Sequence, residues 1–392
     1  MLLAAVKAAE TENIDLEKCS GRVLAQEVRS PGDVPPFDRS PLDGYAFRAA
    51  DSQYASKDAP VTLKVLEEIT AGDVPHFEIT EGTASRIMTG APIPEGADAV
   101  TMYEVTEFTD TEVKIFRPSK PGENVVYKGE DIKAGTLLAC PGMKIDAGLA
   151  GTIASQNIEK PLVHKKIKVG IISTGSELQR VGTELEQGKI YDSNSYTFTA
   201  ACVSKGFDAI RYGIVRDTAD EISCAICKAL SECDAVILTG GASVGDFDVT
   251  PEAMEKAGAE ILFRGVDLKP GMACAFAIKD DKLICGLSGN PASALTTFYV
   301  VALPALKKMA GESDCIPKEF TVTLANDFSK KSRGTRVLRG RLDLGGDEPA
   351  FVIPGAQGNV VLSSSIGADC MAIVPAGSGP LPAGTKLRAF LM

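Results

Sequence analysis

The spacing of hydrophobic and polar positions changes several times along the chain. Between residues 31 and 130, short extended runs rich in Val, Ile and Thr, such as "VTLKVLEEI", "ADAVTMYEV" and "TEVKIFRP", alternate with proline and glycine. Such runs predict a β-rich domain. The flanking stretches "MLLAAVKAAETEN" and "AGLAGTIASQN" have helical composition, whereas "GRVLAQEVRS" alternates like a strand. We therefore expect residues 1–30 and 131–162 to form one N-terminal linking domain, with the β-rich domain 31–130 inserted in it.

From residue 163 onward, strand patterns alternate with helix patterns. The strand-like runs "IKVGIISTGSE", "DAIRYGIVRD" and "DAVILTGG" are separated by the helix-like runs "SNSYTFTAACVSKGF" and "TADEISCAICKALSEC". "LICGLSGNPASALTTFYVVALPAL" adds a further strand, a turn and a long helix. This order predicts an α/β domain over 163–313, with a parallel or mixed sheet and helices on both faces. Residues 314–392 read as short strands and predict a small C-terminal β domain.

Polar residues follow several of the predicted strands. In an α/β sheet, ligands bind beyond the carboxyl ends of the strands, so these residues are expected on one rim. They are Thr174, Glu177, Asp217, Asp246 and Asp248.

The stretch "VILTGGASVGDFDVTPE" combines glycines with two carboxylates. Glycine lets backbone N–H groups approach a ligand closely, and Thr250-Pro251 reads as the N-cap and first residue of a helix whose N-terminus favours an anion. Two acids beside an anion suggest a bridging metal. The other interpretation is a tight strand-to-helix turn with solvated acids.

Composition excludes several classes of function. The chain has 392 residues and a formal charge of −11, which argues against a nucleic-acid partner. No apolar run approaches the length of a membrane span, and we expect no membrane association. The 10 cysteines are scattered and no signal peptide opens the sequence, so reduced thiols in the cytoplasm are expected.

Histidine and cysteine offer little chemistry. Only His76 and His164 are present, which excludes a multi-histidine metal centre and leaves carboxylates to carry most of the chemistry. Cys224 and Cys227 form a C-x-x-C, but with Cys233 they follow a helical spacing. We predict a packed helix face there rather than a zinc or redox site.

Other loops are ambiguous when each is read alone. Neither common nucleotide fingerprint is present, which argues against a P-loop enzyme and a Rossmann dehydrogenase. "RIMTGAPIPEGADAV" presents Thr89 before two prolines, and "DRSPLDGYA" places Asp43 before a glycine. A proline-braced turn and a routine Asp turn would explain these two loops equally well.

Taken together, the motifs are more specific. "PPFDRSPLDGYAFRAAD", "RIMTGAPIPEGADAV", "IISTGSEL", "YDSNSY", "ILTGGASVGDFD" and "LKPG" with "GLSGNPASALTTFY" resemble, in order and spacing, the motifs of the MoeA family of molybdopterin molybdotransferases. The animal relative of that family is the gephyrin E domain. The resemblance covers nearly the whole chain. It implies an elongated homodimer of four domains that takes adenylylated molybdopterin and molybdate and releases AMP with Mg²⁺.

The resemblance also implies site residues. In the family the site lies between the α/β domain of one subunit and the β-rich domain of the other. The catalytic residues would be Asp43 and Thr89 from the β-rich domain, and Glu177, Asp217, Asp248 and Lys269 from the α/β rim. Mg²⁺ would be held by Glu177, Asp246 and Asp248. Substrate-binding residues would be Thr174, Gly175, Gly240, Gly241, Ser243, Gly245, Ser288, Gly289, Asn290, Pro291 and Ser293.

The chemistry fits these residue types. Cleaving a phosphoanhydride requires neutralised charge on the phosphate oxygens, which carboxylate-bound Mg²⁺ and backbone N–H groups supply. Molybdate and tungstate are tetrahedral dianions of nearly equal size, and either would need amide and hydroxyl donors such as those of "SGNPAS", where Asn290 to Ser293 open a helix.

The chain also departs from the family pattern. Met272 occupies a usually basic position, "SGNP" replaces "PGNP", and Arg39 and Pro41-Leu42 replace the usual neighbours of Asp43. With Met272 in that position, we expect either a weaker affinity for anions or a lysine supplied from another part of the protein.

Two other functions compete with the transferase. A molybdopterin adenylyltransferase, which is also a possible partner, shares the "GG-x-S-x-G" loop, and a non-catalytic scaffold of gephyrin type shares the fold. The "DGYA" and "TGAP" domains argue against the first, and the intact acids argue against the second.

Overall fold

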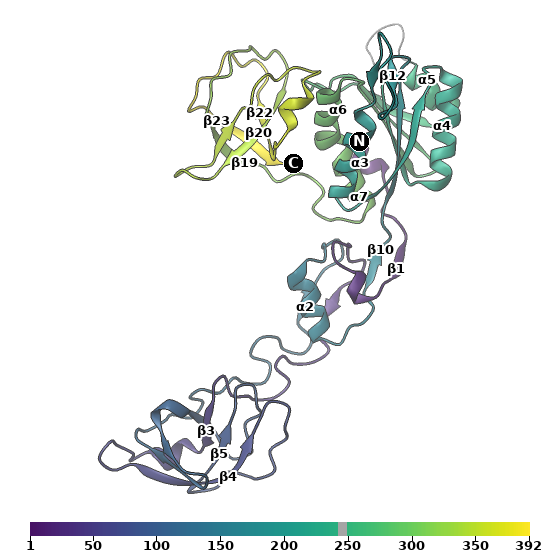
Figure 1. Cartoon of the computed structure of the whole chain (residues 1–392). Coiled ribbons are helices and arrows are strands. Elements are labelled where there is room, and N and C mark those ends of the chain that lie inside the picture. The colour runs from purple at the N-terminus through teal and green to yellow at the C-terminus, as the bar shows by residue number, and fades with distance from the viewer. Residues whose placement is uncertain (242–248) are drawn as a thin grey trace. The chain divides into compact units, whose positions relative to one another are not determined.

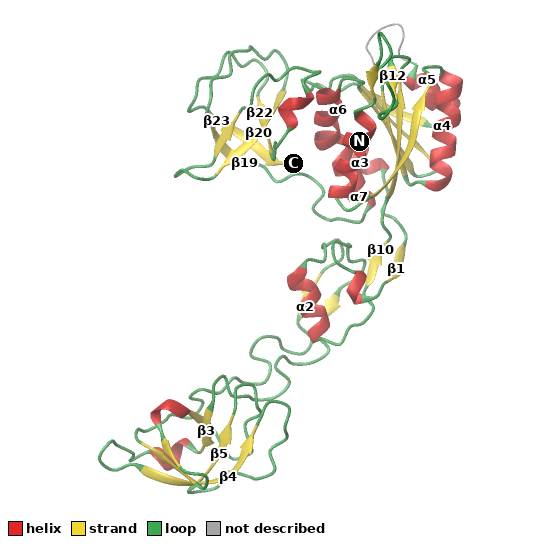
Figure 2. Ribbon diagram, viewed as in Figure 1, coloured by secondary structure: helices red, strands yellow, loops and turns green. Residues whose placement is uncertain are grey.

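The computed structural model describes residues 1–241 and 249–392. Contacts divide the described chain into two compact units. Unit 1 comprises residues 1–26, 141–150 and 160–392, and unit 2 comprises residues 27–140 and 151–159. Figure 1 follows the elements along the chain, and Figure 2 separates helices from strands.

Unit 2 is built on a six-stranded sheet, which confirms the predicted β-rich part. Every residue of β3 (Gly44–Phe47) is buried, because neighbouring strands flank it and apolar clusters cover both of its faces. In spatial order the strands are β6 (Ala99–Met102), β3, β5 (Thr83–Ile87), β4 (Val61–Ile69), β8 (Glu112–Ile115) and β7 (Glu107–Phe108). The smaller elements of the unit are β2 (Val28–Arg29), which pairs with β9 (Leu137–Ala139), η2 (Ala49–Ser52) and η3 (Tyr103–Val105).

The N-terminal segment is less helical than its alanine content predicts. Only α1 (Leu2–Ala5) forms, while Thr11–Asn13 is strand β1, paired antiparallel with β10 (Leu162–His164). The prediction of a helix over the whole stretch was wrong because a short isolated helix is marginal in water, whereas pairing with a distant strand satisfies the backbone. The second predicted helix is present as α2 (Ala147–Ser155), and η1 (Leu16–Lys18) precedes it.

The centre of unit 1 is a mixed six-stranded sheet with helices on both faces, as the sequence predicts. In spatial order the strands are β14 (Asp208–Val215), β11 (Lys168–Thr174), β15 (Ala235–Thr239), β18 (Lys282–Leu287), β17 (Cys274–Lys279) and β16 (Glu260–Arg264). The first four are parallel, and the last two are antiparallel to their neighbours. α3 (Asn194–Ser204), α6 (Pro291–Thr297) and α7 (Leu303–Met309) cover one face, and α4 (Ala219–Glu232) and α5 (Thr250–Lys256) cover the other (Figure 1).

Two details of these helices differ from the sequence-based expectations. On α4, Cys224 and Cys227 are exposed, because Ile222, Ile226 and Leu230 form the buried stripe and the two cysteines lie off that stripe. The packed-face prediction holds only for Cys233, which is buried. At α5 the N-cap is Val249 rather than Thr250.

Thr250 is the first residue of α5, and its hydroxyl donates to the carbonyl oxygen of Gly240 at 3.1 Å, which ties the helix back to the end of β15. The predicted long helix after Asn290 is present, but the π-helical segment η4 (Phe298–Ala302) joins α6 to α7. Pro304 is the second residue of α7 and has no N–H to continue the regular α-helical ladder.

Five further strands of unit 1 form the predicted C-terminal β domain, a closed barrel. In barrel order they are β19 (Phe320–Leu324), β21 (Ala350–Val352), β20 (Arg336–Asp343), β22 (Cys370–Val374) and β23 (Lys386–Leu391), and η5 (Leu362–Ser365) lies between β21 and β22 in the chain. Beside the central sheet, β12 (Leu178–Gln179) pairs with β13 (Ile190–Tyr191). In the described ranges, every helix falls short of the length and apolar character that a bilayer crossing requires.

Candidate active site

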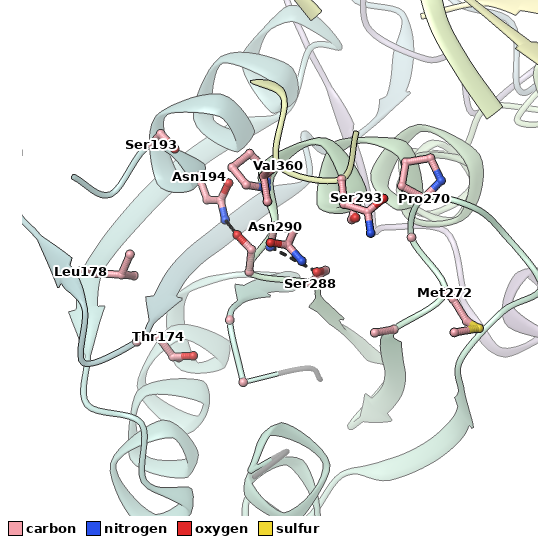
Figure 3. Close-up of a pocket in the computed structure, with 18 of the residues that line it drawn as sticks. Thr174, Leu178, Ser193, Asn194, Pro270, Met272, Ser288, Asn290, Ser293 and Val360 are labelled. Carbon is pink, nitrogen blue, oxygen red and sulfur yellow. Dashed lines mark hydrogen bonds between the residues drawn. The ribbon is translucent and has the colours of Figure 1, made fainter. Parts of the chain in front are cut away.

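A cavity of about 820 Å³ in unit 1 opens at the carboxyl ends of β14, β11, β15 and β18. This is the position at which α/β sheets bind ligands. The sequence-predicted site residues that line it are Thr174, Gly175, Glu177, Asp217, Gly240, Gly241, Lys269, Ser288, Gly289, Asn290, Pro291 and Ser293. Figure 3 shows Thr174 on one side of the cavity and Ser288, Asn290 and Ser293 on another. Ser243, Gly245, Asp246 and Asp248 lie outside the described residues.

Glycine is required where β15 meets β11. Gly240 has a φ of 103°, and a Cβ added there would lie 2.0 Å from the backbone oxygen of Thr174. A Cβ on Gly241, whose φ is 62°, would lie 3.1 Å from Oδ1 of Asp217. The two glycines therefore allow the end of β15 to approach the end of β11 and the Asp217 carboxylate.

Glu177 and Asp217 bring two carboxylates to the same part of the cavity. The Glu177 carboxylate folds over Gly175 so closely that a Cβ there would lie 2.7 Å from both of its oxygens. Desolvation raises the pKa of Asp217, the Thr174 hydroxyl partly offsets this rise, and the nearby Glu177 carboxylate adds to it. Over residues 1–241 and 249–392, no group of three or more His, Cys, Asp or Glu side chains is arranged to hold a metal ion. Glu177 and Asp217 therefore place two mutually repelling carboxylates in this part of the cavity.

The turn around Ser288 to Ser293 uses several of its backbone amides internally. Ala292 and Ser293 donate their N–H groups to the backbone oxygen of Asn359, at 3.1 and 3.3 Å. The Asn290 N–H donates to Ser288 Oγ at 3.2 Å (Figure 3). An oxyanion at this turn would therefore meet the hydroxyl groups of Ser288 and Ser293 rather than these three amides.

Three cavity residues were missed as site candidates although the quoted motif "YDSNSY" contains two of them. Asn194 donates through Nδ2 to the Gly289 oxygen at 2.9 Å, while its buried Oδ1 has no hydrogen-bond partner in the described chain. Asp192 is buried and accepts from Ser173 Oγ and the Ser195 N–H through Oδ1, at 2.8 and 3.1 Å. The third, Asn359, comes from the C-terminal barrel domain, and no local pattern points to it.

The loop after β16 supplies the only lysine among the described lining residues. The Lys269 N–H donates to the Thr335 oxygen at 2.8 Å, and the Lys269 oxygen accepts from Val337 N–H at 2.9 Å, so the barrel domain fixes this backbone. Met272, which replaces the usual basic residue, also lines the cavity and is 55% exposed (Figure 3). The departure noted in the sequence therefore places a thioether, which is a weak hydrogen-bond acceptor and carries no charge, on the cavity wall.

Asp43 and Thr89 belong to unit 2 and form a pair there. Oδ1 of Asp43 accepts the Thr89 backbone N–H at 2.7 Å and the Thr89 hydroxyl at 2.8 Å. The backbone N–H and then the hydroxyl hold the pKa of Asp43 below its ordinary value, with a smaller contribution from Arg86. The Asp43 side chain is therefore an ionised, oriented carboxylate at neutral pH.

Comparisons with known protein families cover nearly the whole chain. Residues 1–156 match the MoeA N-terminal region (domain I and II), and residues 321–391 match the MoeA C-terminal region (domain IV). Residues 170–308 match a domain described as a probable molybdopterin binding domain.

Individual proteins give the same result. A molybdopterin molybdenumtransferase of Staphylococcus epidermidis is 38% identical over 379 residues, which is 97% of this chain and 90% of the relative. A molybdopterin molybdenumtransferase of Staphylococcus aureus is 37% identical over 378 residues, 96% of this chain and 90% of that relative. A crystal structure of the molybdopterin biosynthesis MoeA protein of Pyrococcus horikosii has a TM-score of 0.82 and 33% identity, over 100% of this chain and 96% of that one.

Proposed function

The chain belongs to the MoeA family, and we propose that it inserts molybdate into adenylylated molybdopterin with release of AMP. Its relatives named molybdopterin molybdenumtransferase make it a transferase of molybdenum cofactor biosynthesis. The observation that carries the finer proposal is the single cavity in which Glu177, Asp217, Lys269 and the Ser288–Ser293 turn meet. The family matches include the domains on both sides of the α/β domain, which argues against an adenylyltransferase. The relatives are named as transferases, so a non-catalytic scaffold is not favoured either.

The chain's own groups have distinct parts in this reaction. Lys269 would place a positive charge beside the phosphate or the oxyanion. The Ser288 and Ser293 hydroxyls would donate to molybdate or tungstate, and the glycines at the end of β15 would leave room for the molybdopterin phosphate. Asp43, oriented by Thr89, would contribute a carboxylate from the β-rich domain of the second subunit.

Mg²⁺ fits this donor set. Mg²⁺ in phosphate sites is held by one or two carboxylates together with substrate oxygens. Desolvation raises the pKa of Asp217 and the Glu177 charge adds to this rise, so a divalent cation beside the two carboxylates would offset their repulsion. We propose Glu177 as a ligand together with Asp246 and Asp248. When bound, Mg²⁺ would neutralise charge on the phosphoanhydride.

The direct test is AMP release by the purified protein. Adenylylated molybdopterin, molybdate and Mg²⁺ together are expected to give AMP, and omission of either molybdate or Mg²⁺ is expected to lower its rate strongly. An adenylyltransferase would instead consume ATP with molybdopterin and release pyrophosphate. ATP-dependent pyrophosphate release without molybdate-dependent AMP release would therefore refute the proposed reaction.

We further propose that the protein is a cytoplasmic homodimer and that each site takes Asp43 and Thr89 from the second subunit. In that arrangement, Asp43→Asn and Asp217→Asn chains are each inactive alone but complement one another when mixed. Random assortment makes half of the dimers mixed, each with one intact site, so about a quarter of the parent activity is expected. Mixed dimers without recovered activity, or a fully active monomer in sedimentation, would contradict the shared site.

A molybdopterin adenylyltransferase is the proposed partner that hands over the substrate.

A further inference from the structure

Two cysteines on the outer side of α4 have no part in the proposed reaction. Cys224 and Cys227 are exposed, whereas Ile222, Ile226 and Leu230 form the buried stripe of this helix. α4 covers one face of the central sheet, and neither cysteine lines the cavity at the strand ends (Figure 1). Because free cysteine is among the most buried residue types, two exposed thiols on one helix are an unusual feature.

The two cysteines are neighbours on the helix surface. Residues three apart in an α-helix differ by about 60° around the axis and about 4.5 Å along it, so their Cβ atoms lie about 5–6 Å from one another. Both cysteines are in the middle of α4, which the Thr218 side chain caps at its N-terminus. The helix therefore holds the two side chains at a fixed spacing from which both sulfur atoms can reach one ion.

A positively charged group lies against one of the thiols. The ammonium of Lys279, at the end of β17, donates to Cys227 Sγ at 3.7 Å and to the Ala257 oxygen at 2.6 Å. Cys227 Sγ also lies 3.9 Å from the same oxygen, which belongs to the C-cap of α5. The Ala257 carbonyl thus holds the ammonium beside the sulfur. A thiolate at Cys227, which is the form that binds metals, would keep this ammonium as its partner.

The nearby carboxylates of α4 are paired with other cations. Asp220 lies 2.9 Å from Lys256, and Glu221 lies 3.9 Å from Arg216. Within the part of the chain that the structure describes, no set of three or more His, Cys, Asp or Glu side chains is arranged to hold a metal ion. Two sulfur atoms are too few for a structural zinc site, which takes four ligands, and Mg²⁺ and Ca²⁺ prefer oxygen. Thiolate ligands suit a soft monovalent ion such as Cu(I).

We propose that Cys224 and Cys227 form a surface site for Cu(I), with Lys279 beside it. On binding, two S–H bonds break, two S–Cu bonds form, two protons pass to the solvent, and copper keeps its oxidation state. One singly positive ion and two thiolates give a complex with one negative charge. The Lys279 ammonium would stabilise that charge, whereas it would repel a hard divalent cation. The site uses no residue of the cavity and does not depend on the proposed function.

Anaerobic titration of the full-length protein with Cu(I) tests the proposal. Ascorbate keeps copper reduced, and competition with bathocuproine disulfonate measures stoichiometry and affinity. We expect the parent to bind one Cu(I) tightly, and Cys224→Ser and Cys227→Ser each to bind it about a hundredfold or more weakly, because each loses one of the two sulfur ligands. X-ray absorption of the bound copper should show two sulfur neighbours. Without copper, both variants should release AMP at the parent rate.

Two control variants separate a paired site from the general reactivity of exposed thiols. Cys140 is also exposed but lies in unit 2, so Cys140→Ser is expected to stay within about twofold of the parent affinity. Cys227→Ser combined with Glu232→Cys keeps two thiols on α4 but separates them by eight residues, or about 12 Å along the axis. One ion cannot bridge that distance, so this double variant should bind Cu(I) as weakly as Cys227→Ser.

The charge of Lys279 can be tested separately. Lys279→Met removes the ammonium and is expected to weaken Cu(I) binding by up to about fivefold, the effect of a partly exposed ion pair. A parent protein that binds Cu(I) no more tightly than Cys224→Ser would overturn the proposal. Parent affinity in the variant with separated thiols, or loss of binding in Cys140→Ser, would overturn it as well. These results are independent of AMP release, so the proposed reaction and the copper site can fail separately.

Discussion

Asp217→Asn is expected to lower the rate of AMP release by about a hundredfold or more, which corresponds to about 2.7 kcal/mol of transition-state stabilisation. The substitution keeps the size of the side chain but removes one of the two carboxylates that meet in the cavity. Without the Asp217 charge beside them, the proposed ligands Glu177, Asp246 and Asp248 would bind Mg²⁺ more weakly, and less charge would be neutralised on the phosphoanhydride. Initial rates at several Mg²⁺ concentrations measure the loss.

The pH dependence gives this prediction a second measurement. Because the pKa of Asp217 is raised, its carboxyl takes up a proton at a higher pH than an ordinary aspartate does. The apparent affinity of the parent for Mg²⁺ should therefore weaken as the pH falls through that raised pKa, and Asp217→Asn should lack this titration. A variant that is folded and keeps the parent rate and the parent Mg²⁺ dependence would exclude a catalytic role for Asp217.

Asp220→Asn provides the control for this substitution. Asp220 is in the same domain, but its side chain is 86% exposed and pairs with Lys256 on the surface. Its loss is expected to change stability by less than about 0.5 kcal/mol and to leave the rate of AMP release unchanged. A comparable loss of rate in both variants would indicate a general effect of charge on the protein rather than a local one.

Gly240→Ala is expected to reduce the free energy of unfolding of unit 1 by about 3 kcal/mol or more. The residue has a φ of 103°, which an L side chain rarely adopts, and the new Cβ would lie 2.0 Å from the Thr174 backbone oxygen and 2.9 Å from its carbonyl carbon. No rotation of a side chain relieves a contact with backbone. The strand ends would have to separate, so AMP release should fall as well.

Gly213→Ala separates the conformational cost from the contact. Gly213 is on β14 of the same sheet and has a φ of 85°, but a Cβ there would meet no atom within 4 Å. Its substitution is expected to cost only about 1–2 kcal/mol. Urea unfolding followed by the helical circular dichroism signal measures both variants, since α3 to α7 are all in unit 1. Equal costs for the two substitutions would show that the contact with Thr174 is readily relaxed.

The sequence alone determined the elements whose pattern is strong and local. β4 and α4 have nearly the predicted bounds, because a nine-residue β-prone run and a helical stripe with Thr218 as N-cap are each sufficient signals. The order of strands and helices also predicted which strand ends share a rim, and this brought Thr174, Glu177 and Asp217 to one cavity. The reason is topological: parallel strands connected by helices present all their carboxyl ends at the same edge.

Contacts between distant segments were decided only by the tertiary structure. The alanine-rich N-terminus gives up most of its helical preference because Thr11–Asn13 pairs with Leu162–His164, about 150 residues later in the chain. Asn359 reaches the cavity because the barrel domain packs against α6, and it does not lie in a pattern that marks a site. Sequence periodicity indicates which face of an element is apolar. The partner against which that face packs depends on contacts across the whole chain. The cavity wall formed by the barrel domain could therefore be identified only from the tertiary structure.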